Sequence, residues 1–231
     1  MTKRIEIYDD SLGAVELVDH MGDDLTVVNS ARVSFGKRKG ELEEKDKKLI
    51  KYLVNNKHTS TLEHNVVTFR FTVPLFVRSQ HHRHRTWSYN EISRRYTAEN
   101  LRFYEPTKFR TQHKSDRQSS NTDNIDPELP GYFYLRASDK VRAHHVNCLS
   151  LYESLLEAGV CREQARGILP QNLYTEYYGT ANLNNILKFI GLRLDKHAQW
   201  EIRQVAAAVL DIITDIYPAT VSSFRLSNVV K

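Results

Sequence analysis

Side chains that could do chemistry are concentrated between residues 83 and 96. This stretch reads Arg-His-Arg-Thr-Trp-Ser-Tyr-Asn-Glu-Ile-Ser-Arg-Arg-Tyr. Its arginines can fork onto phosphate oxygens, and its amides, hydroxyls and rings can hold a planar heterocycle. Polar residues of every kind are mixed here, which leaves few positions for a core face. We therefore interpret the stretch as a binding segment and not as a solvated basic helix.

Two other kinds of site compete with this interpretation. His58, Glu63 and His64 suit a metal by type. Helical zinc motifs place two histidines four residues apart with a glutamate between them. The spacing here differs, so a polar turn is favoured and no metal is expected. A nucleic-acid interface is the second alternative, because Trp87, Tyr89 and Tyr96 near arginines suit base stacking. It predicts salt-dependent binding to long polyanions and no bound chromophore.

Composition limits the domain count, the cellular compartment and the classes of binding motif. The 231 residues suit one domain, residues 1–231, and the chain is 40% hydrophobic with a net charge of +5. Two cysteines and the lack of a signal peptide or long apolar run favour a reducing cytoplasm, with no membrane partner. GxGxxG, GxxxxGK[ST] and GxSxG motifs are missing. A bound dinucleotide would therefore rest on side chains and helix ends.

Hydrophobic periodicity predicts the elements that position these residues. Period-two alternation is clearest at 67–73 and recurs at 173–180, with weaker strands at 4–7 and 14–18. Helical spacing or caps predict helices at 23–33, 49–54, 75–82, 132–156, 162–169, 182–191 and 202–216, the last ended by Pro218. Residues 111–130 lack an apolar period, and we expect a loop that is mobile or acts as a lid. The balance favours an α+β domain with a small sheet.

The residue order in the polar stretch resembles the signature of the flavin-dependent thymidylate synthases. That signature is Arg-His-Arg, two residues, then Ser-x-Asn-Glu-x-Ser-x-Arg-Tyr. The matching residues are Arg83, His84, Arg85, Ser88, Asn90, Glu91, Ser93, Arg95 and Tyr96. Three further segments, around His58 to His64, Ala165 to Thr175 and Leu192 to Glu201, look like family segments. The resemblance therefore covers most of the chain and argues against nucleic-acid binding.

The resemblance implies a specific reaction and assembly. It implies a homotetramer of α+β chains with a small, mostly antiparallel sheet and several long helices. FAD binds between subunits, and each active site draws on several chains. The reaction implied is reductive methylation of dUMP to dTMP. Methylenetetrahydrofolate gives the carbon, and NADPH gives the hydride by way of FAD.

The family's binding positions fall on named residues of this chain. The dUMP positions are Gln80, Arg83, Glu91, Ser93, Arg95, Arg166 and Arg193. The FAD positions are Ser60, Arg83, His84, Arg85, Glu91, Asn182 and Asn184. His58 matches a histidine at the folate and flavin face.

Residue chemistry suggests a role for several of these positions. Arg95 and Arg166 can clamp the nucleotide phosphate. Arg193 is the expected catalytic residue: beside the uracil ring it would stabilise charge at N3 and O4, worth about 3 kcal/mol. His84 and Arg85 would favour an anionic reduced flavin.

A few positions depart from the family's usual residues or need a choice between roles. No histidine base follows Ser93, so we interpret it as a binding hydroxyl and not as a nucleophile. Ser60 stands where threonine is common and keeps the hydroxyl. His81 and His82 stand where bulky aromatics are common, and we expect them to alter access to the site. Lys188 also differs from the family's usual polar residues.

Overall fold

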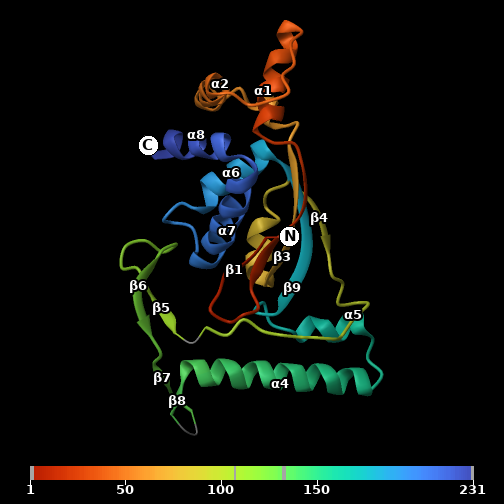
Figure 1. Ribbon diagram of the computed structural model, residues 1–231. Coiled ribbons are helices and arrows are strands. Elements are labelled where there is room, and N and C mark those ends of the chain that lie inside the picture. The colour runs from red at the N-terminus through yellow and green to blue at the C-terminus, as the bar shows by residue number, and fades with distance from the viewer. Residues whose placement is uncertain (1–2, 107, 132–133, 230–231) are drawn as a thin grey trace.

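A five-stranded antiparallel sheet forms the centre of the computed structural model, which describes residues 3–106, 108–131 and 134–229. The strand order is β1-β2-β3-β9-β4, and each neighbouring pair is antiparallel (Figure 1). The strands are β1 (Arg4–Glu6), β2 (Ala14–Met21), β3 (Val66–Pro74), β9 (Tyr174–Asn182) and β4 (Ser88–Glu91). The strands expected from alternation are therefore confirmed, and β4 is an addition that the sequence did not predict.

The core lies on one face of this sheet. Phe69, Phe71 and Val73 in β3 are fully buried, whereas Arg70 between them is exposed. This alternation is the period-two burial of a half-covered strand. Helices α6 (Leu183–Arg193) and α7 (Trp200–Ile216) present buried apolar residues to the same core and cover this face (Figure 1). The result is one α+β domain, as expected.

The remaining helices surround this centre. They are α1 (Asp24–Arg32), α2 (Glu44–Asn55), α3 (Leu75–His81), α4 (Ala137–Glu157), α5 (Arg162–Ala165) and α8 (Pro218–Val229). Short 3₁₀ turns are η1 (Val33–Phe35), η2 (Thr59–Leu62) and η3 (Arg166–Ile168). Two expected helix caps are confirmed, because Asp23 accepts a hydrogen bond from the Thr26 amide and Asn182 from the Asn185 amide.

Two expectations about elements were wrong. Residues 111–130 are not a structureless loop, because they contribute to a hairpin of β5 (Phe109–Gln112) and β6 (Ser120–Ile125). Strand β7 (Glu128–Leu129) then pairs with β8 (Leu135–Arg136). Because β8 precedes it, α4 begins at Ala137 and not at 132; residues 132 and 133 lie outside the described part. The expected end of the 202–216 helix before Pro218 is confirmed, because α7 ends at Ile216; a further helix, α8, then begins at Pro218, since proline suits a first helical turn.

Candidate active site

The polar stretch follows α3 and folds as a tight turn, the edge strand β4 and a second turn. Within β4 the exposed Ser88 and Asn90 alternate with inward residues. Trp87 is only 6% exposed, and the Tyr89 hydroxyl donates to the His81 carbonyl at 3.0 Å. Trp87 is the one buried residue of this stretch, so the expectation that it has few core positions is confirmed. The burial of Trp87 also removes one of the rings that the nucleic-acid alternative needed.

His81 is a core residue and not a site residue. Its ring is fully buried, and its Nδ1 lies 2.8 Å from the Tyr177 hydroxyl. It packs edge-on against Phe71 and Trp87. The expectation that His81 alters access to the site was wrong, because a buried ring fills the aromatic position in the core. His82 is half-buried and stacks on Tyr89.

A first cluster of predicted site residues forms around Arg193, at the end of α6. Its Nε donates to His84 Nε2 at 3.1 Å, and its Nη2 donates to the Gln80 carbonyl at 3.0 Å. Because a guanidinium only donates, His84 Nε2 must accept, so the ring proton lies on Nδ1. Burial, followed by the charge of Arg193, lowers the pKa of His84 to about 4. His84 is therefore neutral near pH 7 and can favour an anionic ligand only through Nδ1–H.

Cationic side chains without acidic partners adjoin this cluster. Burial and then the like charge of Arg83 lower the pKa of Arg193. Within the described residues, the exposed side chains of Arg83 and Arg85 form no hydrogen bond or ion pair. Guanidinium groups that have no partner among the described residues are suited to bind an anionic ligand.

A second cluster lies in a pocket of about 320 Å³ between α3, β4 and η3. This pocket brings together Glu91, Ser93 and Arg166, three of the predicted dUMP residues. Glu91 Oε1 accepts from Arg78 Nε at 3.0 Å and from Thr175 Oγ1 at 2.7 Å. The sequence analysis gave no role to Arg78 or Thr175.

The two arginines predicted to clamp the phosphate, Arg95 and Arg166, lie in different surroundings. Arg166 lines the pocket and is exposed, and its side chain forms no ion pair with the described residues. Arg95 lies outside the pocket lining and pairs with Glu163 at 3.0 Å, with both side chains exposed. An exposed pair of this kind contributes little and can open for an anion.

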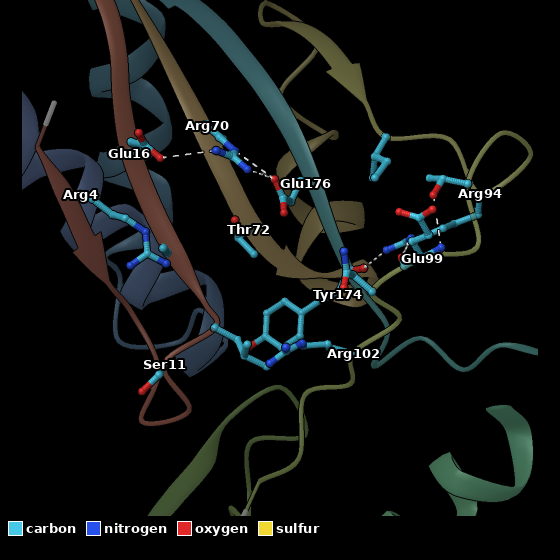
Figure 2. A pocket seen from close by; sticks show the side chains of 15 residues that line it. Arg4, Ser11, Glu16, Arg70, Thr72, Arg94, Glu99, Arg102, Tyr174 and Glu176 are labelled. Carbon is cyan, nitrogen blue, oxygen red and sulfur yellow. Dashed lines mark hydrogen bonds and ion pairs between the residues drawn. The ribbon is translucent and has the colours of Figure 1, made fainter.

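A larger hollow of about 470 Å³ adjoins this pocket and shares Ile92 and Arg94 with it. Figure 2 shows it on the open face of the sheet, where Arg70 points to Glu176 and Glu16. Arg94 donates to the Glu99 and Tyr174 carbonyls. The hollow contains none of the predicted site residues, and most of its arginines already have partners.

A third group of predicted residues lies where η2 meets the start of α6. Ser60 and His58 are exposed. The Asn182 side chain caps α6, and Asn184 is buried with its Nδ2 donating to Glu63 Oε1 at 2.9 Å. Asn184 thus connects the end of η2 to α6, and its side chain points into the protein interior.

The hydrogen-bond donors of the first and third groups of residues suit FAD. They include the start of an eleven-residue helix and the exposed Ser60 hydroxyl. They also include the guanidiniums of Arg83 and Arg85, which can bind a pyrophosphate.

No hydrogen bond or ion pair of the described residues joins the first cluster to the second. Residues 3–106, 108–131 and 134–229 also contain no group of three histidine, cysteine or acidic side chains that could hold a metal ion. No helix in that part of the chain is both long and apolar enough to cross a membrane.

Comparison with known proteins agrees with the geometry. A family described as "Thymidylate synthase complementing protein" matches residues 16–219. "Flavin-dependent thymidylate synthase" of Thermus thermophilus is 43% identical over 213 residues, which cover 92% of this chain and 76% of that protein. The protein of the same name from Thermotoga neapolitana is also 43% identical, with 92% and 90% covered.

A solved structure extends the agreement to the fold. The UMP/dUMP methylase PolB from Streptomyces cacaoi, bound with 5-Br dUMP, superposes with a TM-score of 0.77 at 31% identity. The superposition covers 96% of this chain and 97% of PolB. With the signature residues placed as described above, these findings show that the chain is an enzyme of the flavin-dependent thymidylate synthase family.

Proposed function

We propose that this enzyme methylates dUMP reductively to dTMP. Methylenetetrahydrofolate would give the carbon, and bound FAD would supply the redox chemistry that carries the hydride of NADPH. The observation that carries the proposal is the setting of Arg193. This cation is half-buried, fixed by His84 and the Gln80 carbonyl, and beside the unpaired Arg83.

Arg193 is suited to polarise a uracil ring. A guanidinium has five N–H donors, and Nε and one Nη2 hydrogen are used within the chain. The remaining donors are free for the O4 and N3 edge of the base. Negative charge that develops there is stabilised by a cation already in place, which makes C5 more nucleophilic.

The other predicted contacts divide between the two ligands. Glu91, Ser93 and Arg166 would hold dUMP in the pocket, with Arg95 completing the phosphate clamp and Gln80 and Arg83 as further contacts. Arg83, Arg85, His84, Ser60 and Asn182 would hold FAD, and His58 would lie at the folate face. Asn184 would support the FAD contacts through Glu63. The two free cysteines suit a cytoplasmic location.

We also propose a homotetramer whose sites are shared between chains. No hydrogen bond or ion pair of the described residues joins the two clusters of predicted dUMP residues. Large apolar side chains are exposed on α4, where Val146 is 61% and Leu151 51% exposed, and on η1, where Phe35 is 78% exposed. We propose that another chain covers these side chains in the assembly.

UMP is the second candidate substrate, because PolB is described as a UMP/dUMP methylase. Relatives at 43% identity that are named thymidylate synthases favour dUMP. A direct comparison of the two nucleotides distinguishes the candidates.

The test is anaerobic spectroscopy of the FAD-loaded protein, followed by product analysis. The protein should retain the yellow flavin through desalting and bleach with NADPH, and dUMP should change the bleaching rate. Adding methylenetetrahydrofolate should then yield dTMP, with UMP as the parallel substrate. A colourless protein after desalting, or bleaching without any dTMP, would refute the proposal.

A further inference from the structure

A buried ion pair holds the first turn of α7 against the β5–β6 hairpin. Glu201 is only 4% exposed. Arg110 Nη2 lies 2.8 Å from Glu201 Oε1 and 3.0 Å from Oε2, and the Tyr104 hydroxyl donates to Oε1 at 3.3 Å. A carboxylate that is paired with an arginine only accepts hydrogen bonds. Any further group that contacts Glu201 must therefore be a donor.

Two side-chain amides connect this carboxylate to the end of α3. Gln199 Nε2 donates to Glu201 Oε2 at 2.9 Å, and Gln199 Oε1 accepts from Gln80 Nε2. The carboxylate fixes this direction, because the opposite orientation of Gln199 would place an oxygen against it. Gln199 therefore presents an acceptor to the amide group of Gln80.

Gln80 is also the residue that anchors Arg193. Its backbone carbonyl accepts from Arg193 Nη2 at 3.0 Å. This carbonyl lies in the last turn of α3, where carbonyls have no helical partner and a side chain can satisfy them. Helix ends fray, and α3 is only seven residues long, so its end depends on contacts from outside the helix. The Tyr89 hydroxyl supports the next carbonyl, that of His81, and Gln199 supports Gln80 itself.

We propose that Glu201 and Gln199 are positioning residues for Arg193. This inference rests on the proposed function, in which Arg193 stabilises charge that develops on the uracil ring. Glu201 orients the Gln199 amide, which holds Gln80. The Gln80 carbonyl in turn fixes one of the two contacts of the guanidinium. A donor that is not held in place must reorganise as charge develops, so the relay acts on the chemical step more than on the binding of dUMP.

Gln199→Met tests the proposal, since methionine has a similar length but offers no strong acceptor to Gln80. The readouts are the single-turnover rate of dTMP formation from enzyme whose FAD has been reduced beforehand, and the dissociation constant of dUMP. We expect the rate to fall about tenfold, whereas the dissociation constant changes less than about threefold. Glu201→Gln should give the same pattern, because its amide can face Gln199 with either atom and no longer fixes the direction.

A double-mutant cycle shows whether the effect passes through Arg193. Arg193→Ala leaves no guanidinium to position, so adding Gln199→Met should lower the rate by less than about twofold further. A merely structural defect would lower the rate by the same factor in both backgrounds. Tritium release from dUMP labelled at C5 keeps the low rates of the Arg193→Ala background measurable, because methylation replaces the C5 hydrogen.

Asp116→Asn is the matched control. Asp116 also attaches the hairpin to the segment between α6 and α7, because its Oδ2 lies 3.1 Å from His197 Nδ1. Among the described residues it forms no hydrogen bond with Gln199 or Gln80. The rate of this variant should stay within about twofold of the wild type, since a partly exposed ion pair contributes little.

The outcomes separate this inference from the proposed function. If the wild-type protein makes dTMP, an unchanged rate in Gln199→Met overturns the inference alone, and so does an equal loss in both backgrounds. A loss in Asp116→Asn as large as that in Gln199→Met would show that docking of the hairpin, and not the relay, is responsible, which also overturns it. A wild-type protein that makes no dTMP overturns the proposed function and the inference with it.

Discussion

Arg193 is the residue on which the proposed chemistry depends. His84 and the Gln80 carbonyl hold its guanidinium, so little reorganisation is needed when charge develops on the base. We expect Arg193→Ala to lower dTMP formation by about 100-fold or more, since losing one preorganised donor costs that much. FAD should remain bound, because Arg83 and Arg85 are untouched. Turnover with purified, FAD-loaded protein measures the effect.

The control variant, Lys196→Ala, removes an exposed positive charge that lies close to Arg193 in the sequence. Lys196 is exposed and forms no ion pair with the described residues. Lys196→Ala should keep its turnover within about twofold of the wild type, because exposed charges contribute little. Near-normal turnover in Arg193→Ala, or an equal loss in Lys196→Ala, would contradict the role given to Arg193.

Three neighbouring histidines make the stability sensitive to acid. Burial is the main cause that lowers the pKa values of His81, His82 and His84, the last to about 4. In the unfolded chain these rings take up protons below about pH 6.5, whereas the folded rings stay neutral. The free energy of unfolding should therefore fall as the pH drops from 6.5 towards 4.

Urea unfolding at pH 7.5, 6.0 and 5.0 measures this slope. His84→Asn keeps a polar side chain but cannot titrate, so the slope should become shallower. His197→Asn is the control, since His197 is exposed and outside this group. An unaltered slope in His84→Asn would show that the titration of His84 does not differ between the folded and unfolded chain.

Residue types alone predicted the ligand class but not which side chains face it. The family resemblance named Gln80, His84 and Arg193, which the fold does bring together. It could not show that His81 and Trp87 are buried, because a polar neighbourhood in sequence says nothing about strand pairing. The alternation that places Trp87 inside depends on β4 pairing with β9, a contact between distant segments.

At the scale of elements, the carboxylate of Asp24 connects α8 to α1 by hydrogen bonds. Asp24 in α1 accepts from the Thr220 amide and hydroxyl at 3.0 and 2.6 Å, and from the Ala219 amide at 2.7 Å. It thereby satisfies free amides at the start of α8. We expect Asp24→Ala to destabilise the docking of α8 by about 2 kcal/mol. Hydrogen exchange of the α8 amides should accelerate, and that of β3 should not.

The comparison variant is Ser222→Ala, an exposed substitution on the same helix. Its α8 amides should exchange as in the wild type. If Asp24→Ala leaves the α8 amides as protected as before, packing and not the cap holds this helix in place.

Elements with an apolar face were predictable, and those without one were not. Strand β3 and helices α6 and α7 each bury a periodic apolar stripe, which the sequence displays directly. The β5–β6 hairpin buries almost none, because its residues are exposed or half-buried. Long-range contacts such as Arg110 with Glu201 hold it in place. A search for hydrophobic periodicity has no access to such contacts.

At the scale of the whole molecule, we propose that one chain presents two incomplete halves of a site. Arg193, His84 and Gln80 form one half, and the pocket with Glu91 and Arg166 forms the other. In a closed homo-oligomer, a half from one chain can face the complementary half of its neighbour. The sequence could not show this division, because the same residues would be required if all lay in one chain.

Complementation between two inactive variants tests the sharing directly. Arg193→Ala disables one half and Arg166→Ala the other. When the two chains are coexpressed with different tags and hybrids are purified through both, about one site in four should contain two intact halves. Turnover per bound FAD should then rise well above the sum of the two variants. Mixing the separately purified variants without subunit exchange is the control and should give no such rise. If each site lay within one chain, every site in the hybrid would carry one defect, and turnover would stay at the level of the two variants.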